Sequence, residues 1–370
     1  MTATDLKSLA KSAARRAADR TLHHAPMPLW RRLFPKTELG VCYHVVSDRP
    51  PPHIKHYRVL DTGAFEADLD YLQSNFEFIS YGQLVQRRGA ANQARDNSFV
   101  LTFDDGFAEC ASVVAPLLRR RGLSCVFFVI TDLIDNTELF RESEAALCID
   151  AILKLPVDDV LAMVDELGLG ARLRAQAAQM ADPSAWSLEI ADVGAAPDPR
   201  LAPLLHWLVN LTADEAEELE RLRAKLGIEP ARYLREAQPY LTTQQIKQLH
   251  ADGFTVGAHS RSHRRLQQLS RAEAEREIVE SCQAIRDITG QASVPFAFPY
   301  FGGDLDRTWL AQLRARHDVI GLFFDTDGLR EDEPFVVQRV FGERFGPDRS
   351  MDAILRRAWS RRPAWRKRPG

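Results

Sequence analysis

Phe99-Val100-Leu101-Thr102-Phe103 has the pattern of a buried strand, and this strand ends at Asp104-Asp105-Gly106. A helical pattern follows near 108–121, and Cys125-Val126-Phe127-Phe128-Val129-Ile130 has the composition of a second buried strand. A strand, a helix and a strand in this order form a βαβ unit, in which the two strands run parallel. This part of the chain therefore predicts an α/β protein built on a parallel sheet.

The same alternation of strands and helices extends in both directions from this unit. Polar residues gather at the C-terminal ends of the expected strands, as they do in (β/α) barrels. The sequence therefore predicts an open or closed α/β barrel. Its other expected strands are 39–46, 254–258, 296–298, 319–324 and 336–337, and its other expected helices are 62–75, a helix ending at 250, 270–289 and 305–316.

Residues 135–240 interrupt the alternation, because their apolar residues recur at helical spacing over a long segment. We interpret this segment as a helical insertion into the barrel domain, acting either as a lid over a site or as structural padding. The predicted organisation is a basic N-terminal segment (1–36), a barrel domain (37–345) interrupted by the insertion, and a basic C-terminal tail (346–370).

The composition is that of a globular protein with an uneven distribution of charge. Of the 370 residues, 45% are hydrophobic and 27% are charged, which excludes a disordered or collagen-like chain. The net charge of −3 combines +6 in residues 1–36 and +7 in residues 356–370 with −16 in the remainder. An acidic body argues against nucleic acid as a partner. The basic ends suit contact with an anionic membrane surface, unless they are simply solvated.

Cysteine usage and the first residues predict a cytoplasmic protein. The five cysteines are widely spaced and include no C-x-x-C pair, which argues against a disulfide framework and against a thiolate zinc site. Residues 1–20 carry charges throughout and lack the apolar core of a secretory signal. No apolar run reaches the ~18 residues that a membrane-spanning helix needs. We therefore predict a cytoplasmic location, with peripheral contact at the inner membrane surface as a further hypothesis.

The adjacent carboxylates of Asp104 and Asp105 are the first candidate for a functional site. Two carboxylates at the end of an apolar strand repel each other and lose hydration, so they need a compensating group. A metal ion compensates if one carboxylate binds it and the other stays free as a base. The alternative is a hairpin turn at Asp105-Gly106, which fits poorly because a helical pattern follows the glycine.

His259-Ser260-Arg261-Ser262-His263 is the second candidate. Two histidines four residues apart can reach one metal ion, although such a pair is also found in polar surface loops. His259 directly follows the expected strand 254–258, just as Asp104 follows its own strand. Ends of parallel strands meet at the same edge of a sheet, so we expect one shared site there.

Two histidines and one carboxylate leave coordination positions of a metal ion open to water. A Zn²⁺ ion lowers the pKa of such a water towards ~7 and polarises a substrate carbonyl. A free carboxylate nearby can take the proton of the water. This residue set therefore predicts hydrolysis of an amide or an ester.

Three motifs in this order, TFDDG (102–106), HSRSH (259–263) and FAFPY (296–300), resemble the polysaccharide deacetylases of the NodB-homology group, carbohydrate esterase family 4. The first strand, with YHVV (43–46), is similar to the branch that deacetylates N-acetylglucosamine polymers. The resemblance covers roughly 37–135 and 240–345. It implies a distorted (β/α) barrel and a hydrolase that removes N-acetyl groups.

The resemblance also assigns roles to individual residues. Asp104 corresponds to the catalytic base, and Asp105, His259 and His263 correspond to three metal ligands. Tyr300 corresponds to the residue whose backbone N–H helps to stabilise the oxyanion. The expected cofactor is a divalent metal, with zinc first and cobalt, manganese or nickel as alternatives.

The chain departs from the family pattern at two positions. Many members carry an arginine two residues before the proline of the third motif, where this chain has Ala297. Many also carry a late Leu-x-His that supplies the general acid, and His317 does not match it. Our hypothesis is that His44, at the end of the first strand, protonates the leaving amine. The alternative is that His44 is a structural histidine beside Tyr43.

Three further residues are predicted to bind the substrate, each with a competing interpretation. Phe298 could stack on a sugar, although an aromatic residue in a strand is more often part of the core. Asp325 lies at the correct edge to hold sugar hydroxyls, although Asp327-Gly328 nearby has the pattern of a simple turn. Arg339 could orient a carboxylate or the substrate, or form a surface salt bridge.

The predicted reaction is attack of metal-bound water on an acetamide, with Asp104 accepting the proton. The substrate implied by the resemblance is an N-acetylated sugar in a glycan or glycolipid precursor. Three alternatives remain open: a small-molecule amide hydrolase on the same fold, a glycan-binding protein without turnover, and an interaction scaffold formed by the insertion.

Overall fold

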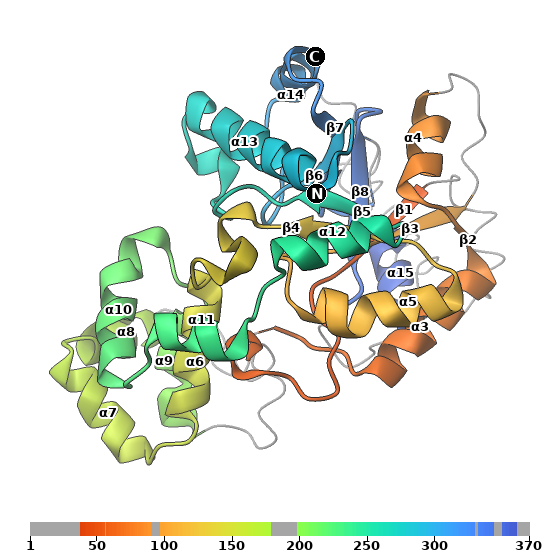
Figure 1. Cartoon of the computed structure of the whole chain (residues 1–370). Coiled ribbons are helices and arrows are strands. Elements are labelled where there is room, and N and C mark those ends of the chain that lie inside the picture. Colours follow the sequence, from red (N-terminus) through yellow and green to blue (C-terminus); the bar gives the residue numbers. More distant parts are fainter. Residues whose placement is uncertain are drawn as a thin grey trace, which may run out of the picture.

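The computed structural model describes residues 38–55, 57–89, 97–178, 198–329, 332–343 and 350–360, and Figure 1 shows their arrangement. Parallel strands form a barrel that closes where β1 pairs with both β3 and β8. The expectation of a distorted (β/α) barrel is therefore confirmed. The strands of the closed barrel are β1 (Glu38–Tyr43), β3 (Ser98–Phe103), β4 (Val126–Val129), β5 (Thr255–Ala258), β6 (Val294–Ala297), β7 (Ile320–Asp325) and β8 (Val336–Phe341).

The distortion of the barrel is visible at β3. The short strand β2 (Glu77–Phe78) pairs with Ser98 and Phe99 at the start of β3, whereas β4 pairs only with Thr102 and Phe103 at its end. β4 therefore lies beside the end of β3 that leads into Asp104. The sequence patterns indicated neither β2 nor the helix α4 (Tyr81–Gly89) that follows it.

Helices pack around the barrel, and their ends follow the expected signals. In α13 (Arg271–Thr289), Ser270 and Glu273 form the predicted capping box, and Gly290 ends the helix with a φ of 75°. A short π-helical turn over residues 110–114 leads into α5 at Ala115. The other barrel helices are α3 (Thr62–Asn75), α5 (Ala115–Arg121), α12 (Thr243–Ala251), α14 (Arg307–Arg316) and α15 (Met351–Ser360).

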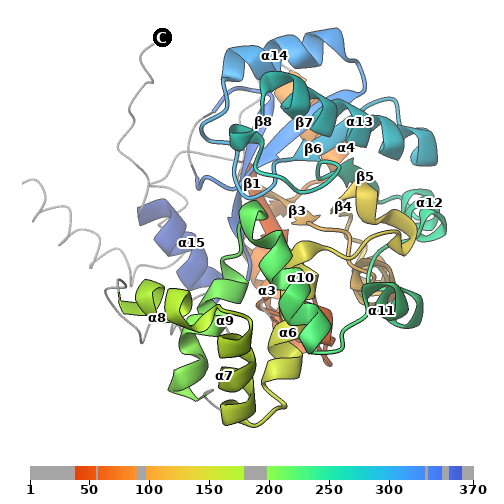
Figure 2. The same ribbon diagram turned by 90° about the vertical axis from the view of Figure 1, so that its left-hand side faces the viewer.

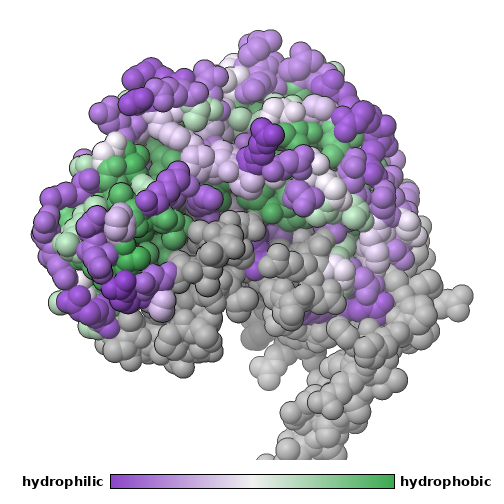
Figure 3. Space-filling model, turned by 90° about the horizontal axis from the view of Figure 1, so that it is seen from below, coloured by the Kyte–Doolittle hydropathy of each residue, from purple (hydrophilic) through white to green (hydrophobic). Residues whose placement is uncertain are grey.

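The expected helical insertion lies between β4 and α12 and forms its own compact layer beside the barrel (Figures 1 and 2). All of its helices except α11 share a separate hydrophobic cluster that includes Ile149, Val160, Leu205 and Leu222. From below, apolar side chains appear on the insertion among polar ones (Figure 3). The helices are α6 (Arg141–Ile152), α7 (Val157–Glu166), α8 (Gly170–Ala178), α9 (Ala202–Val209), α10 (Ala216–Lys225) and α11 (Pro230–Ala237).

Part of the segment predicted as a basic C-terminal tail is instead the packed helix α15. Met351, Leu355 and Trp359 recur every four residues and are buried in the main core. Arg356, one of the cations of the predicted basic tail, is buried and pairs with Asp352. The prediction failed because the high density of arginines in 356–368 obscured the apolar face of the helix.

The hypothesis of membrane contact concerns the basic ends, residues 1–36 and 356–370, of which 1–36 and 361–370 lie outside the described residues. It stays a prediction. None of the helices in the described ranges is both long and apolar enough to cross a lipid bilayer.

Candidate active site

The predicted site residues meet at the carboxyl ends of the barrel strands. Asp104 and Asp105 follow β3, His259 follows β5, Tyr300 comes shortly after β6, and His44 follows β1. Together with His263, they line a pocket of about 840 Å³. The insertion forms the opposite wall of the pocket, through α6 and residues 208–214. The site therefore lies between the barrel and the insertion.

The three predicted metal ligands are close enough to share one ion. Oδ1 of Asp105 lies 3.4 Å from Nε2 of His259 and 3.6 Å from Nε2 of His263. All three residues are buried. Two ligand atoms bound to one tetrahedral zinc ion at its usual bond lengths are about 3.4 Å apart. The spacing of these three atoms therefore fits a single small divalent ion.

The hydrogen bonds of these side chains are made by the atoms that would not bind the ion. The Nδ1–H of His259 donates to the backbone oxygen of Ala297 at 3.0 Å, so the lone pair of this imidazole lies on Nε2. Tyr57 donates its hydroxyl to Oδ2 of Asp105 at 2.7 Å. Oδ1 of Asp105 is buried and accepts no hydrogen bond from the residues that the structure describes. A buried, unpaired carboxylate oxygen between two imidazole nitrogens is what a cation site requires.

The electrostatics keep Asp105 ionised. Burial alone would raise the pKa of this carboxyl group, but the neighbouring His259, His44 and His263 outweigh it and hold the pKa well below its usual range. Burial also lowers the pKa of His263 to about 3, so this imidazole is neutral at physiological pH. A carboxylate and a neutral imidazole are the forms in which these side chains bind metals.

Local backbone conformations direct the ligands into the site. Asp105 and His263 have φ values of 70° and 57°, in the left-handed region that non-glycine residues rarely adopt. The loop after β5 is held by Glu277 of α13, which accepts hydrogen bonds from the backbone N–H groups of Arg261 and Ser262. The Oγ of Ser260 accepts a hydrogen bond from the N–H of His263. The intervening residues of HSRSH therefore hold the shape of the loop.

Asp104, the predicted base, is held by a buried arginine from β8. The guanidinium of Arg339 makes two hydrogen bonds with the Asp104 carboxylate, at 2.6 and 2.9 Å. Burial would raise the pKa of Asp104, but Arg339 outweighs this effect and lowers it. Gly40 makes room for the arginine, because a Cβ at this position would clash with the Arg339 side chain. Asp104 is thus fixed in its ionised form.

This geometry confirms the prediction that Arg339 could orient a carboxylate, and it corrects the two other predicted roles. Its side chain is 0% exposed and does not line the pocket, so it forms neither a substrate contact nor a surface salt bridge. It instead supplies the orienting arginine that the chain lacks at Ala297. The only charged residue in β8 was the available signal, because a buried cation needs an anionic partner.

His44 is paired with Glu343, a residue that sequence reasoning missed. Nδ1 of His44 lies 2.7 Å from Oε2 of Glu343, and Oε1 of Glu343 accepts the backbone N–H of His44. Burial opposes protonation of the imidazole, but the Glu343 carboxylate outweighs it and raises the pKa of His44 to about 10. His44 is therefore a cation at neutral pH and has a proton to donate.

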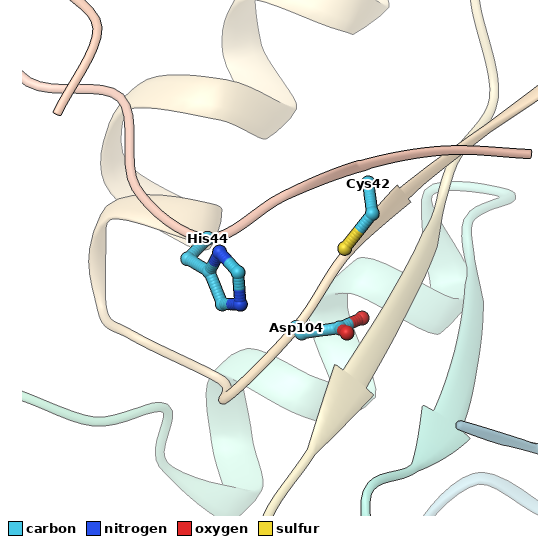
Figure 4. A group of neighbouring side chains, drawn as sticks. All are labelled: Cys42, His44 and Asp104. Carbon is cyan, nitrogen blue, oxygen red and sulfur yellow. The ribbon is translucent and has the colours of Figure 1, made fainter. Parts of the chain in front are cut away.

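Cys42, His44 and Asp104 form a second group whose side chains approach within 4.8 Å of one another (Figure 4). The Arg339 guanidinium already occupies both oxygens of Asp104. Burial raises the pKa of the Cys42 thiol well above its ordinary value, so the sulfur stays protonated. The contacts of Asp104 with Arg339 and of His44 with Glu343 account for this group, so it does not require a metal ion.

The structure places the two remaining predicted substrate contacts largely in supporting positions. Phe298 is buried and stacks on Phe323 with ring centroids 5.1 Å apart, although its side chain also reaches the pocket wall. Asp325 is buried, accepts the N–H of Gly302 at 2.8 Å and pairs with Arg307 at 3.0 Å. Asp325 does not line the pocket. It therefore holds the loop that carries Tyr300, which corrects its predicted role.

Comparisons with known proteins agree with the motifs. A family model described as polysaccharide deacetylase matches residues 91–166 and 220–319, which confirms the resemblance found in the sequence. Residues 167–219 of the insertion lie outside this match. No curated protein sequence matches the chain at a significant level.

Several solved structures are similar to this chain at low sequence identity. The deacetylase PplD of Streptococcus pyogenes, solved with acetate, is 14% identical over 83% of this chain and 93% of its own, with a TM-score of 0.47. The de-N-acetylase of Aggregatibacter actinomycetemcomitans is 13% identical over 82% and 94%, with a TM-score of 0.44. IcaB of Ammonifex degensii is 16% identical over 88% and 98%, with a TM-score of 0.46.

Proposed function

We propose that the chain, which matches the polysaccharide deacetylase family model over residues 91–166 and 220–319, is a metal-dependent hydrolase that removes N-acetyl groups from an N-acetylated sugar. One observation carries the proposal. Three residues that could hold a metal ion line the same pocket as an ionised carboxylate, held by Arg339, and a protonated imidazole, held by Glu343. This arrangement provides separate groups for activating water, accepting a proton and donating one.

Asp105, His259 and His263 are the residues that would hold the ion. A divalent ion at this position would act as a Lewis acid on the acetamide carbonyl and lower the pKa of a bound water. Two imidazole nitrogens and one carboxylate oxygen suit zinc, and they also accept cobalt, manganese or nickel. We propose zinc as the resident metal.

The remaining steps are assigned to the side chains around this ion. Asp104, kept ionised by Arg339, accepts the proton of the attacking water. The backbone N–H of Tyr300 stabilises the negative charge that develops on the carbonyl oxygen. As the C–N bond breaks, His44 gives its proton to the leaving nitrogen, so that an amine and acetate are released. His44 then becomes neutral and Asp104 carries the extra proton.

The shape of the pocket supports a sugar substrate rather than a small amide. A volume of about 840 Å³ is far more than an acetamide group fills. Phe341 lines the pocket, is 41% exposed and stacks on His44 with an interplanar angle of 16°. An exposed ring beside the proton donor offers an apolar face to the sugar whose amine is released. We therefore propose an N-acetylated glycan or glycolipid as the substrate class.

The wild-type protein provides the test of this function. It should release acetate from N-acetylglucosamine oligomers at least about tenfold faster than from small acetamides of equal concentration, because only the oligomers fill the pocket. A chelator should abolish the release, and added Zn²⁺ should restore it. Faster release from the small acetamides would favour the amide hydrolase. Bound oligomer with no release in any metal would favour a glycan-binding protein.

Replacement of Glu343 by glutamine should move the basic limb of the pH profile to lower pH. His44 acts in its protonated form, so activity is present below its pKa and is lost as the pH rises through it. Without the Glu343 carboxylate, burial lowers the pKa of His44 from about 10 towards or below its ordinary value of 6.5. Release of acetate by Glu343→Gln at pH 8.5 should therefore be roughly 100-fold lower than at pH 6.

The matched control for this prediction is Glu275→Gln. Glu275 forms a similar pair with His317 at 3.1 Å, but neither residue lines the pocket. Its pH profile should equal that of the wild type. If Glu343→Gln keeps the wild-type basic limb, His44 is not the proton donor.

A further inference from the structure

The insertion contributes one carboxylate to the surroundings of the metal ligands. Glu142 lies in the first turn of α6 and lines the pocket opposite the barrel. Its Oε1 accepts the hydroxyl of Tyr300 at 2.6 Å and lies 4.0 Å from Nδ1 of His263. Glu142 therefore stands behind one metal ligand and one residue of the predicted oxyanion site.

The two histidine ligands differ in how their outer nitrogens are satisfied. Nδ1 of His259 donates to the backbone oxygen of Ala297, whereas the buried Nδ1 of His263 has no hydrogen-bond partner among the described residues. Oε2 of Glu142 is also buried and has no partner within the same ranges. A histidine that binds a metal through one nitrogen donates the N–H of the other to a carboxylate, a carbonyl or a water.

We propose that Glu142 is the positioning carboxylate of His263, so that the insertion completes the metal centre of the barrel. This inference rests on the proposed metal-dependent function. When His263 binds the ion through Nε2, its Nδ1 carries a proton, and a shift of about 1 Å brings the Glu142 carboxylate into hydrogen-bonding range. The hydrogen bond fixes the ring and makes Nε2 a stronger ligand.

The same carboxylate restrains Tyr300. Tyr300 has a φ of 60°, and its ring lies 4.8 Å from that of His263. The guanidinium carbon of Arg265 lies over the Tyr300 ring, 3.8 Å from its centroid. Thr326 donates its hydroxyl to the Tyr300 backbone oxygen. Glu142 is thus the contact through which α6 holds both His263 and Tyr300.

The test measures metal affinity without substrate. Glu142→Gln keeps the size of the side chain and an acceptor for the Tyr300 hydroxyl, but it removes the negative charge. Its affinity for Zn²⁺, measured by competition with a chromogenic chelator, should fall roughly 10- to 100-fold. In the cobalt-loaded protein, the visible absorption bands should shift. The metal-free melting temperature should stay near that of the wild type.

Two control variants distinguish the effect of the Glu142 charge on Zn²⁺ affinity from the effects of neighbouring groups. Glu144 lies on the same helix, faces Arg223 and does not line the pocket. The Glu144→Gln protein should therefore bind Zn²⁺ as the wild type does. Tyr300→Phe removes the hydroxyl contact but keeps the carboxylate, and its Zn²⁺ affinity should stay within about twofold of wild type. A Glu142→Gln protein with wild-type affinity would overturn the proposal while leaving the metal site intact. Absence of metal binding in the wild type itself would instead overturn the proposed function.

Discussion

Replacement of Asp105 by alanine should remove both bound metal and acetate release. Asp105 supplies the only carboxylate of the proposed ligand set, and its Oδ1 lies between the two imidazole nitrogens. Without it, two neutral imidazoles remain, and the third protein ligand that a catalytic zinc site requires is lost. We expect less than about a tenth of the wild-type metal content after dialysis, and acetate release at the background of the assay.

The control for Asp105→Ala is Asp132→Ala, which removes another pocket carboxylate that pairs with Arg261 at 3.3 Å. Its metal content should equal that of the wild type. Full metal content in the Asp105→Ala protein would place the ion elsewhere. The Cys42, His44 and Asp104 group would then be the next set to examine.

The barrel and the ligand set could be predicted because each depends on short segments of sequence. A carboxylate or a histidine directly after an apolar strand has its position fixed by that strand, and parallel strands end at one edge. Asp105 and His259 were found in this way, and the structure brings them within 3.4 Å of each other. The capping box at Ser270 was likewise a local signal, and it forms as expected.

The partners of these residues could not be predicted, because they come from distant parts of the chain. Arg339 lies 235 residues from Asp104, Glu343 lies 299 residues from His44, and Glu142 comes from the insertion. Sequence periodicity predicts which side of an element is buried, but it contains no information on which charge opposes another across the barrel. Asp325 was misassigned for the same reason, since a strand-end carboxylate can equally bind a neighbouring backbone N–H.

Arg339 of β8 and Glu343, two residues beyond the end of this strand, hold the proposed base and the proposed acid. Residues 339 and 343 flank Phe341 at intervals of two, the period of side chains on one face of a strand. Arg339 holds Asp104, the proposed base, while Phe341 covers His44 and Glu343 holds it. One short segment therefore sets the protonation of both groups, with Asp104 ionised and His44 charged.

Replacement of Arg339 by methionine should lower both stability and turnover. The Asp104 carboxylate would stay buried without its partner, and breaking a buried ion pair in this way costs about 3–5 kcal/mol of unfolding free energy. Loss of Arg339 would also raise the pKa of Asp104, so a smaller fraction of the proposed base would be ionised at a given pH. Acetate release at pH 7 should fall roughly 100- to 10,000-fold, the usual contribution of a general base. Urea unfolding and steady-state assays measure the two effects.

The stability that the Arg339–Asp104 pair contributes depends on pH. In the wild type, Arg339 lowers the pKa of Asp104, so this pair contributes stability above the ordinary carboxyl pKa and loses it as the pH falls through the lowered value. In Arg339→Met the carboxyl becomes neutral at a higher pH than in the unfolded chain. The stability difference between wild type and variant should therefore be largest at pH 7 and shrink towards pH 3.

A second ion pair, remote from the pocket, provides a control that distinguishes the loss of stability from the loss of the proposed base. Arg88 binds Glu38 at 2.7 Å in a partly buried contact, and neither residue lines the pocket. Arg88→Met should destabilise the protein, but its acetate release per folded molecule should match the wild type. Adding Asp104→Asn to Arg339→Met should recover stability but not activity, because the buried unpaired charge is gone and the base remains absent. If the double variant does not recover stability, Arg339 supports the barrel through packing rather than by holding the proposed base.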